Sequence, residues 1–291
     1  MKNLKKIYVP KRYNYIAAFL TLSCNMKCSY CINAHGRNGI FKDSIISGKE
    51  WIKGLNRLAC SQDLPITLQG GEPSLHPDFV WIINNIRPDL KIDILTNLCF
   101  DVDKFIKEVS PSRLCRDALY PNIRVSYHPG QLSLDILIER VSKIYKAGFS
   151  IGIYGIRYPK FSQEILEAQK KCQDLGIDFR LKEFLGEYDS KLYGNYRYPE
   201  AVSNSERKKC LCRTSELIID PNCDIYKCHH DLYNDFPSIG NLLDPDFKIE
   251  DMFRECDQFG KCNPCDLKVK TNRFQVHGHA SVEVKNIGAL D

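Results

Sequence analysis

The stretch FLTLSCNMKCSYCIN, residues 19–33, joins the end of an apolar run to three closely spaced cysteines, Cys24, Cys28 and Cys31. The apolar run indicates a buried strand, which places the cysteines on the loop that follows it. A structural zinc site usually has four protein ligands, and the next cysteine, Cys60, lies in an apolar segment that indicates a core position. Three thiolates on one loop suit a cubane iron–sulfur cluster in which one iron stays open to another ligand. An open coordination position is a feature of catalytic metal centres.

Apolar runs alternate with amphipathic stretches through the first two thirds of the chain. The runs with the composition of buried strands are residues 15–22, 65–69, 91–96, 122–127, 149–154 and 177–182. The amphipathic stretches between them are residues 48–59, 78–87, 102–109, 133–147 and 161–175. Helix starts are expected at Ser47 and Ser133, and helix ends at Gly148 and Gly176. This alternation predicts an α/β protein with a parallel sheet and helices outside it, as an open sheet or a barrel.

The length and composition narrow the class of protein. The 291 residues are enough for one large domain, or for one domain with an appendage. The basic N-terminus lacks the apolar core of a signal peptide, and no apolar run is long enough to span a membrane. We therefore expect a cytoplasmic protein with no membrane partner, whose 14 cysteines include metal ligands rather than form disulfides. The net charge of +5 is mild and not clustered, so a nucleic acid is not expected as a partner.

Two motifs carry a resemblance to a known family. Residues 24–31, CNMKCSYC, resemble the signature of the radical S-adenosylmethionine (SAM) superfamily, including an aromatic residue before the last cysteine. Residues 68–79, LQGGEPSLHPDF, resemble the superfamily's GGE motif at the end of the second strand. The resemblance implies a partial (β/α)6 TIM-like barrel and a catalytic 4Fe-4S cluster, held by the three cysteines and chelated at its open iron by SAM. The cofactor-binding residues that it implies here are Tyr30, Gly70, Gly71, Glu72 and Pro73.

The GGE segment also has a physical interpretation of its own. Glycines permit close backbone approach, and the carboxylate of Glu72 suits the ammonium group of SAM. Weaker matches follow along the chain. Residues 94–98, ILTNL, resemble the third-strand segment, with Leu98 in place of the usual glycine, and residues 124–129, RVSYHP, lie where the superfamily contacts ribose and adenine. The additional cofactor-binding residues implied by these matches are Thr96, Asn97 and Ser126.

A second group of seven cysteines lies between residues 210 and 265. Four of them resemble the ligands of a SPASM/twitch extension, which carries auxiliary iron–sulfur clusters: Cys212, Cys228, Cys262 and Cys265. The C-x5-C-x2-C pattern at residues 256–265 does not match the full SPASM run, so the shorter twitch form, with a single second 4Fe-4S cluster, is expected. Residues 216–228 predict a β-hairpin, and a helix is expected after it. A zinc ribbon on the same four thiolates is the alternative.

Three cysteines of this segment have no ligand role in the expected pattern. Cys223 occupies a hairpin position where the family usually has glycine, while Cys210 and Cys256 are spare, and each could replace a named ligand. An epimerase must donate a hydrogen atom to its substrate, usually from a thiol. Cys210 and Cys223 are therefore the candidate catalytic residues.

The expected organisation has a barrel followed by a small iron–sulfur domain made of a β-hairpin and a helix. The expected boundaries are an N-terminal extension at 1–14, the barrel at 15–185, a connector at 186–209, the twitch-like domain at 210–270 and a tail at 271–291.

The resemblance implies an enzyme that cleaves SAM reductively and uses the 5′-deoxyadenosyl radical to take hydrogen from an sp3 carbon of its substrate. A second cluster would support oxidation, epimerisation or bond formation. The expected substrate is a peptide or another small molecule, such as a sugar or an aminocyclitol; related enzymes also act on nucleotides. The expected electron donor is flavodoxin or ferredoxin. The rival hypothesis is a non-catalytic iron–sulfur or zinc module for electron transfer or binding, which would have no use for a GGE motif.

Overall fold

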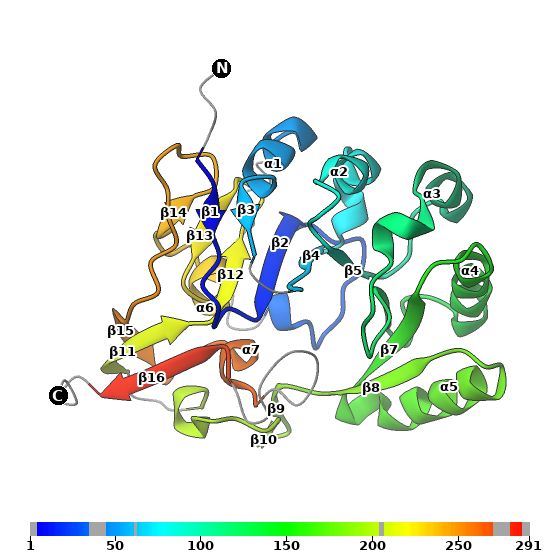
Figure 1. The fold of residues 1–291 in the computed structure, drawn as a ribbon. Helices are drawn as coiled ribbons and strands as arrows, with labels where there is room; N and C mark the ends of the chain where they lie inside the picture. The colour runs from blue at the N-terminus through cyan, green and yellow to red at the C-terminus, as the bar shows by residue number, and fades with distance from the viewer. Residues whose placement is uncertain (1–4, 35–44, 61–62, 204–206, 270–279, 287–291) are drawn as a thin grey trace.

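The structure is a computed structural model that describes residues 5–34, 45–60, 63–203, 207–269 and 280–286 (Figure 1). Within these ranges, the largest sheet has nine strands in the order β14-β13-β12-β2-β4-β5-β6-β7-β8. In that order the strands are Gly240–Asn241, Asp224–Tyr226, Glu216–Ile219, Tyr15–Thr21, Ile66–Gly70, Ile92–Thr96, Ile123–Tyr127, Ile151–Arg157 and Phe179–Glu183. The strands from β2 to β8 run parallel to one another. They form a partial barrel, which confirms the predicted α/β fold.

Five helices cover the outer side of the curved sheet (Figure 1). They are α1 (Gly48–Leu55), α2 (Phe79–Asn85), α3 (Val102–Glu108), α4 (Leu134–Lys146) and α5 (Ser162–Asp174). The predicted helix start at Ser47 is confirmed, because Ser47 and Glu50 form a reciprocal capping box. Ser133 stands at the start of α4 without a side-chain cap hydrogen bond. Gly148 and Gly176 follow α4 and α5 with φ of +91° and +73°, the left-handed conformation expected of helix-ending glycines.

Side chains alternate between the two faces of the sheet along each strand. Ile16 and Ala18 of β2 pack with helical residues such as Trp51 in one apolar cluster, which we call the outer core. Ala17 and Phe19 point to the opposite face and pack with residues of the C-terminal segment. The face opposite helices α1 to α5, which we call the inner face, is therefore the one that can receive a substrate.

The C-terminal segment joins the barrel through β12. This strand pairs in parallel with β2, residues 216–219 being aligned with residues 15–18, and it forms the predicted hairpin with β13. The sheet of the barrel therefore continues past the boundary expected at residue 210. The remaining strands are β1 (Ile7–Tyr8), β3 (Leu58–Ala59), β9 (Gly186–Tyr188), β10 (Lys191–Tyr193), β11 (Lys208–Thr214), β15 (Arg254–Phe259) and β16 (Val282–Asn286), and the short helices are α6 (His229–Tyr233) and α7 (Pro264–Leu267).

Strands β15, β11 and β16 form a separate three-stranded sheet, and β9 and β10 form a hairpin inside the expected connector. Among the described helices, none combines the length and the apolar composition that a bilayer crossing requires.

Candidate functional site

The three cysteines of the first motif lie on the loop between β2 and a short 3-10 helix, Ile32–Ala34. Cys24 and Cys31 are exposed, and Cys28 is half-buried. Burial, helped by the neighbouring Cys31 and Cys24 thiols, raises the pKa of Cys28 to about 12. A thiolate is thus disfavoured at this loop unless a cation compensates its charge. This environment fits a metal cluster bound by the three sulfur atoms.

Two asparagines hold the cysteine loop against the carboxyl ends of the neighbouring strands. Asn33 Nδ2 donates a hydrogen bond of 2.8 Å to the carbonyl oxygen of Gly70. Asn25 Oδ1 accepts one of 2.7 Å from Asn97 Nδ2. The sequence interpretation missed Asn25 and Asn33, although both lie in the stretch that contains the motif. Their residue type alone does not show which strand they contact.

The ends of β2 and β4 approach each other closely at Gly70 and Gly71. The backbone N–H of Gly71 donates to the carbonyl oxygen of Thr21, and that of Glu72 to the carbonyl oxygen of Ser23, each over 2.9 Å. A Cβ atom added to Gly70 would overlap the Thr21 oxygen, and one added to Gly71 would overlap the Ser23 oxygen. The two glycines are therefore required by the pairing of the strand ends, which places this backbone beside the cysteine loop.

The carboxylate of Glu72 is turned into the protein, where the residue is 1% exposed. Its Oε1 accepts hydrogen bonds from the Ser74 N–H (3.1 Å), Ser74 Oγ (2.6 Å) and Thr96 Oγ1 (2.7 Å). Its Oε2 accepts one from the Asn97 N–H (2.7 Å). Burial raises the pKa of Glu72, and these hydrogen bonds oppose that rise. The carboxylate joins the ends of β4 and β5, which differs from the ammonium contact expected from the sequence.

The weaker sequence matches lie at the same edge of the barrel. Pro73 is buried at the start of the 3-10 helix that follows the GGE segment. Thr96 ends β5, and Ser126 lies half-buried on β6. Leu98 has a φ of +59°, the left-handed conformation that favours glycine, while its side chain is fully buried in the outer core. The backbone conformation associated with the family's glycine is thus kept without the glycine.

Tyr30 of the cysteine motif belongs to a group of stacked rings at this edge. Its hydroxyl lies 3.0 Å from His128 Nδ1, and its ring stacks on Tyr158 with the centroids 4.7 Å apart. Burial, and then the nearby Lys182, lowers the pKa of His128 to about 4. The imidazole is therefore neutral at neutral pH, and its Nδ1 can accept a hydrogen bond from Tyr30. The sequence interpretation missed His128 and Tyr158. His128 could have been suspected, because it lies two residues after the predicted cofactor-binding residue Ser126.

Comparisons with known proteins bear on these motifs. No protein-family model matches the chain. Among curated proteins, the GTP 3′,8-cyclase of Nautilia profundicola is 25% identical over 185 residues, which cover 60% of this chain and 57% of the relative. The GTP 3′,8-cyclase of a Sulfurovum species is 24% identical over 212 residues, which cover 70% of this chain and 62% of the relative. The matches thus cover about three fifths of the length of these relatives.

Solved structures share the fold. Native anSMEcpe with bound AdoMet has a TM-score of 0.53 at 12% identity, covering 79% of this chain and 78% of that chain. The complex of native anSMEcpe with AdoMet and the Kp18Cys peptide has a TM-score of 0.52 at 14% identity, covering 79% and 77%. The cyclase relatives, together with the cysteine and GGE motifs on this fold, support a similarity of this chain to the radical SAM superfamily. Radical SAM enzymes use a 4Fe-4S cluster and SAM, and the thiols and glycines at the ends of β2 and β4 fit both.

The C-terminal thiols of this chain gather around β11. The sulfur atoms of Cys210, Cys212 and Cys256 all lie within 4.8 Å of one another. The pairing of β11 with β15 causes this approach, because it aligns Cys210 with Cys256. Hydrogen bonds from the Cys210 and Cys212 thiols lower the pKa of Cys256, which gives its sulfur the thiolate character that a metal ligand needs.

A small cavity lies beside these three thiols. Its lining includes Cys212, Cys228, Cys256 and Cys262. Cys265, expected as a ligand, does not belong to this lining and lies in α7. A thiolate at Cys265 would instead raise the pKa of Lys182 and of His229, so its sulfur lies near those two side chains. The structure thus brings together three of the four expected auxiliary ligands, and adds two cysteines that the sequence pattern treated as spare.

The two candidate catalytic thiols lie apart from the barrel interior. Cys223 is fully buried in the outer core, on the helix side of the sheet. It turns the hairpin with a φ of +64°, which accounts for the glycine usual at this position. Cys210 is buried among the C-terminal thiols. Neither position presents a sulfur to a substrate on the inner face, which speaks against the role of hydrogen donor.

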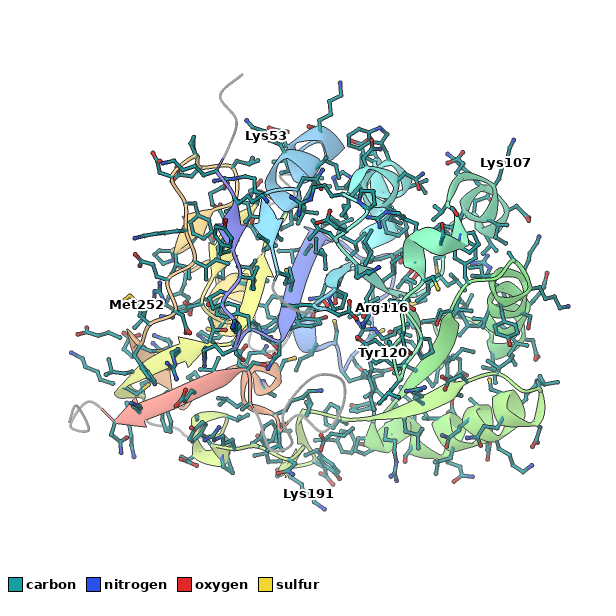
Figure 2. The ribbon with its side chains drawn as sticks, viewed as in Figure 1. Lys53, Lys107, Arg116, Tyr120, Lys191 and Met252 are labelled. Carbon is teal, nitrogen blue, oxygen red and sulfur yellow. The ribbon has the colours of Figure 1, made fainter. Side chains whose placement is uncertain are left out.

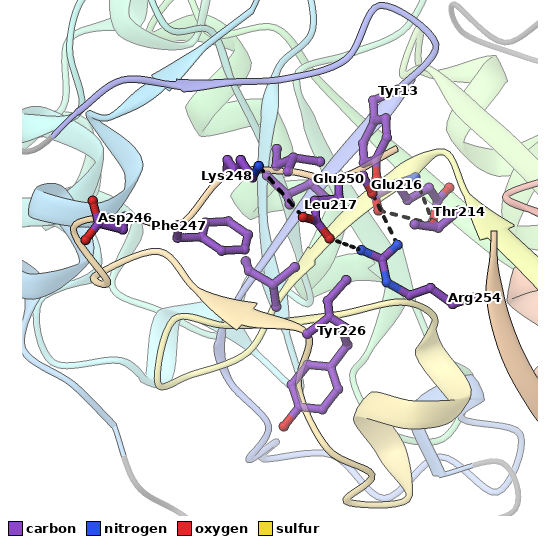
Figure 3. Close-up of a pocket in the computed structure, with 13 residues that line it drawn as sticks. Tyr13, Thr214, Glu216, Leu217, Tyr226, Asp246, Phe247, Lys248, Glu250 and Arg254 are labelled. Carbon is purple, nitrogen blue, oxygen red and sulfur yellow. Dashed lines mark hydrogen bonds and ion pairs between the residues drawn. The ribbon is translucent and has the colours of Figure 1, made fainter. Parts of the chain in front are cut away.

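A cavity of about 240 Å³ lies beside β12 and the chain that leads to β15 (Figure 3). Three of its charged residues pair with one another: Glu250 lies 3.9 Å from Lys248 and 3.6 Å from Arg254. The described lining includes no cysteine and none of the residues at the carboxyl ends of β4 and β5. This cavity is therefore separate from the candidate active site.

Proposed function

We propose that this chain is a radical SAM enzyme that cleaves SAM reductively and takes a hydrogen atom from an sp3 carbon of a substrate bound on the inner face of the barrel. The observation that carries the proposal is the junction of two strand ends, where Gly71 and Glu72 pair with the backbone that leads into the three-cysteine loop. A non-catalytic electron-transfer module would not need this arrangement. When bound, a 4Fe-4S cluster would supply the electron that breaks the sulfonium bond of SAM.

The chain's own residues have distinct parts in this proposal. Cys24, Cys28 and Cys31 would hold the cluster. The backbone of Gly70 and Gly71 would lie against the methionine end of SAM, with Glu72 fixing that backbone through its hydrogen bonds to the end of β5. The sheet and the C-terminal segment would keep water and stray hydrogen donors away from the radical.

A second 4Fe-4S cluster in the C-terminal segment is part of the proposal. What supports it is the group of sulfur atoms of Cys210, Cys212 and Cys256, with Cys228 and Cys262 lining the adjacent cavity. We propose that these cysteines supply the ligands, in place of a set that includes Cys265. A cluster ligated only by thiolates would support electron transfer, and so an oxidation, more readily than direct substrate binding.

The substrate and the partners are proposals as well. The relatives are named for GTP, and one structural neighbour holds a peptide. The substrate classes to test are therefore a nucleotide and a peptide, together with the sugar or aminocyclitol expected from the sequence. We propose a cytoplasmic enzyme whose electrons come from flavodoxin or ferredoxin.

The test is an iron and sulfide count after anaerobic reconstitution, combined with an assay for 5′-deoxyadenosine. Wild-type protein should hold about eight irons, and a Cys24/Cys28/Cys31→Ala triple variant about four. SAM cleavage should disappear in the triple variant and persist in Cys115→Ala, a matched change at an exposed thiol. Cleavage that survives in the triple variant would overturn the proposal. About four irons in wild type and almost none in the variant would assign the C-terminal thiols to zinc.

A further inference from the structure

Five neighbouring strands each contribute a polar or aromatic residue from the middle of the strand or beyond to the inner face of the barrel. They are Thr67 of β4, Asp93 of β5, Arg124 of β6, Tyr154 of β7 and Lys182 of β8. Their orientation follows from alternation, because apolar residues next to them in each strand pack in the outer core. The inner face therefore carries charged side chains inside the barrel.

Asp93 is the buried carboxylate of this group, and its contacts determine how much of the charge of Arg124 is compensated. Its Oδ1 accepts from Arg116 Nε (3.2 Å) and Asn122 Nδ2 (3.1 Å), and its Oδ2 from the Tyr120 hydroxyl (2.9 Å). Arg124 Nη2 lies at a longer 3.4 Å from Oδ2. Arg116 and Tyr120 lie side by side (Figure 2), and Arg116 Nη2 donates a hydrogen bond to the Tyr120 hydroxyl. The carboxylate is thus shared among several donors, and Arg124 is the most distant of them.

Arg124 keeps unused donors in a buried position. The residue is 1% exposed, and its Nη2 makes a second long contact, of 3.4 Å, with Thr67 Oγ1. Its Nε and Nη1 have no hydrogen-bond partner among the described residues. Buried donors are nearly always paired in folded proteins, because an unpaired donor loses its hydrogen bonds to water without replacement. Arg124 therefore has room for an acceptor that the described chain does not supply.

Lys182 adds a positive charge near the same place. Its Nζ lies 4.8 Å from the ring centroid of Tyr154. Within the described ranges it has no hydrogen bond and no ion pair, unlike Arg180 of the same strand, which pairs with Asp178. Burial lowers the pKa of Lys182 to about 7, and the charges of Arg124 and Lys268 add to the effect. Lys182 is half-buried, and its ammonium group has no described carboxylate as a counter-charge.

Two further buried acidic side chains, Glu216 of β12 and Asp266 of α7, are already engaged. Glu216 accepts a hydrogen bond of 2.6 Å from Ser281 Oγ. Asp266 lies 2.7 Å from His229 Nδ1 and, against the effect of burial, raises the pKa of that histidine to about 9. Neither carboxylate serves as a described counter-ion for Lys182.

We propose that Arg124 and Lys182 together bind an anionic group of the substrate, a carboxylate or a phosphate, on the inner face of the barrel. Arg124 is paired with Leu95, the residue before Thr96 at the end of β5, so the anion would lie next to the edge assigned to SAM. The unused guanidinium donors would make charge-assisted hydrogen bonds to it, and Lys182 would supply the net charge.

This inference rests on the proposed function, because it names the substrate class of the same site. It favours substrates with an acidic group, such as a nucleotide or a peptide carboxylate. It disfavours an aminocyclitol, whose ammonium groups would meet two cations of like charge.

The test uses thermal unfolding of the reconstituted protein at pH 7 and fixed ionic strength, with pyrophosphate and succinate as the two probes. An anion with a Kd of about 1 mM, present at about 10 mM, should raise the Tm by about 3 °C over sodium chloride. Lys182→Met should lose the shift, and Lys182→Arg should keep most of it. Lys107→Met, an exposed change on α3 (labelled in Figure 2), should keep all of it. A shift with pyrophosphate alone identifies a phosphate site, and one with succinate alone a carboxylate site.

Two results would overturn the inference. One is wild-type protein that shifts with neither probe. The other is an equal shift in Lys182→Met, which would mean an adventitious ion only. A second readout is the rate at which an N-hydroxysuccinimide ester acetylates Lys182, measured on the Lys182 peptide by mass spectrometry. The anion that raises the Tm should slow this acetylation at least threefold. An unchanged rate would speak against the site. Reductive SAM cleavage by wild type, measured without any probe, tests the proposed function separately.

Discussion

Replacement of Glu72 by glutamine tests whether this carboxylate serves the protein or the ligand. Its four hydrogen bonds come from Ser74, Thr96 and Asn97, all to a carboxylate in a residue that is 1% exposed. An amide can keep its oxygen toward Ser74 and Thr96, but its NH2 group then faces the N–H of Asn97. That N–H loses its acceptor, and the other three bonds lose the charge that strengthens them. The expected loss in the free energy of unfolding is about 3 kcal/mol.

Guanidinium unfolding of the metal-free protein under reducing conditions, followed by tryptophan fluorescence, measures this loss without any contribution from the cofactors. Glu139→Gln is the matched control, because Glu139 is exposed on α4 and its change should cost less than about 0.5 kcal/mol. A loss below about 1 kcal/mol in Glu72→Gln, together with SAM binding at least tenfold weaker in the reconstituted enzyme, would refute the reasoning. That pair of results would mean that the carboxylate contacts the ammonium group of SAM directly.

Three further changes test the same edge of the barrel and the hairpin. Gly71→Ala places a methyl group against the carbonyl oxygen of Ser23. This change should lower the free energy of unfolding by at least about 2 kcal/mol and lower the iron content of the reconstituted protein. A normal iron content would contradict the reasoning. His128 has a folded pKa of about 4 against 6.5 in the unfolded chain, so its contribution to stability is present above pH 6.5 and is lost as the pH falls. Wild type should lose about 2 kcal/mol more than His128→Asn between pH 7 and pH 4.5 in denaturation curves, and equal losses would count against a neutral buried histidine. Cys223→Gly should change the free energy of unfolding by no more than about 1 kcal/mol, because glycine removes the backbone strain at a φ of +64° and this gain offsets the lost packing of the thiol. It should leave SAM cleavage and product formation unchanged, whereas loss of product alone would return Cys223 to the chemistry.

Local patterns in the sequence were enough to predict the barrel. The strands from β2 to β8 are apolar runs covered on the outside by helices, and the helix starts and ends carry their own signals, such as the capping box at Ser47. The motif at the end of β2 predicted the three-cysteine loop because its spacing is contained in eight residues. In each of these cases, the residues that carry the signal are neighbours in the sequence.

Pairings between distant segments could not be predicted in the same way. The approach of Cys210 and Cys256 depends on the register of β11 against β15, which no local pattern encodes. Cysteine spacing predicted Cys265 as a ligand, whereas its place in α7, outside the cavity lined by the other cysteines, is visible only in the structure. Likewise, the inward direction of Arg124 follows from alternation, but its unused donors become visible only when the neighbouring strands are placed around it.

The parallel pairing of β12 with β2 has a consequence for how the protein can be divided. β2 is apolar from residue 16 to residue 20 and has every residue buried, and β12 pairs with the edge of β2 that β4 leaves open. Removal of the chain after residue 207 would turn β2 into an open, hydrophobic edge strand, the kind of edge that recruits strands from other molecules. A truncated barrel should therefore aggregate even with its cysteine loop intact. The C-terminal segment thus protects the strand that leads into the cysteine loop from pairing with other molecules.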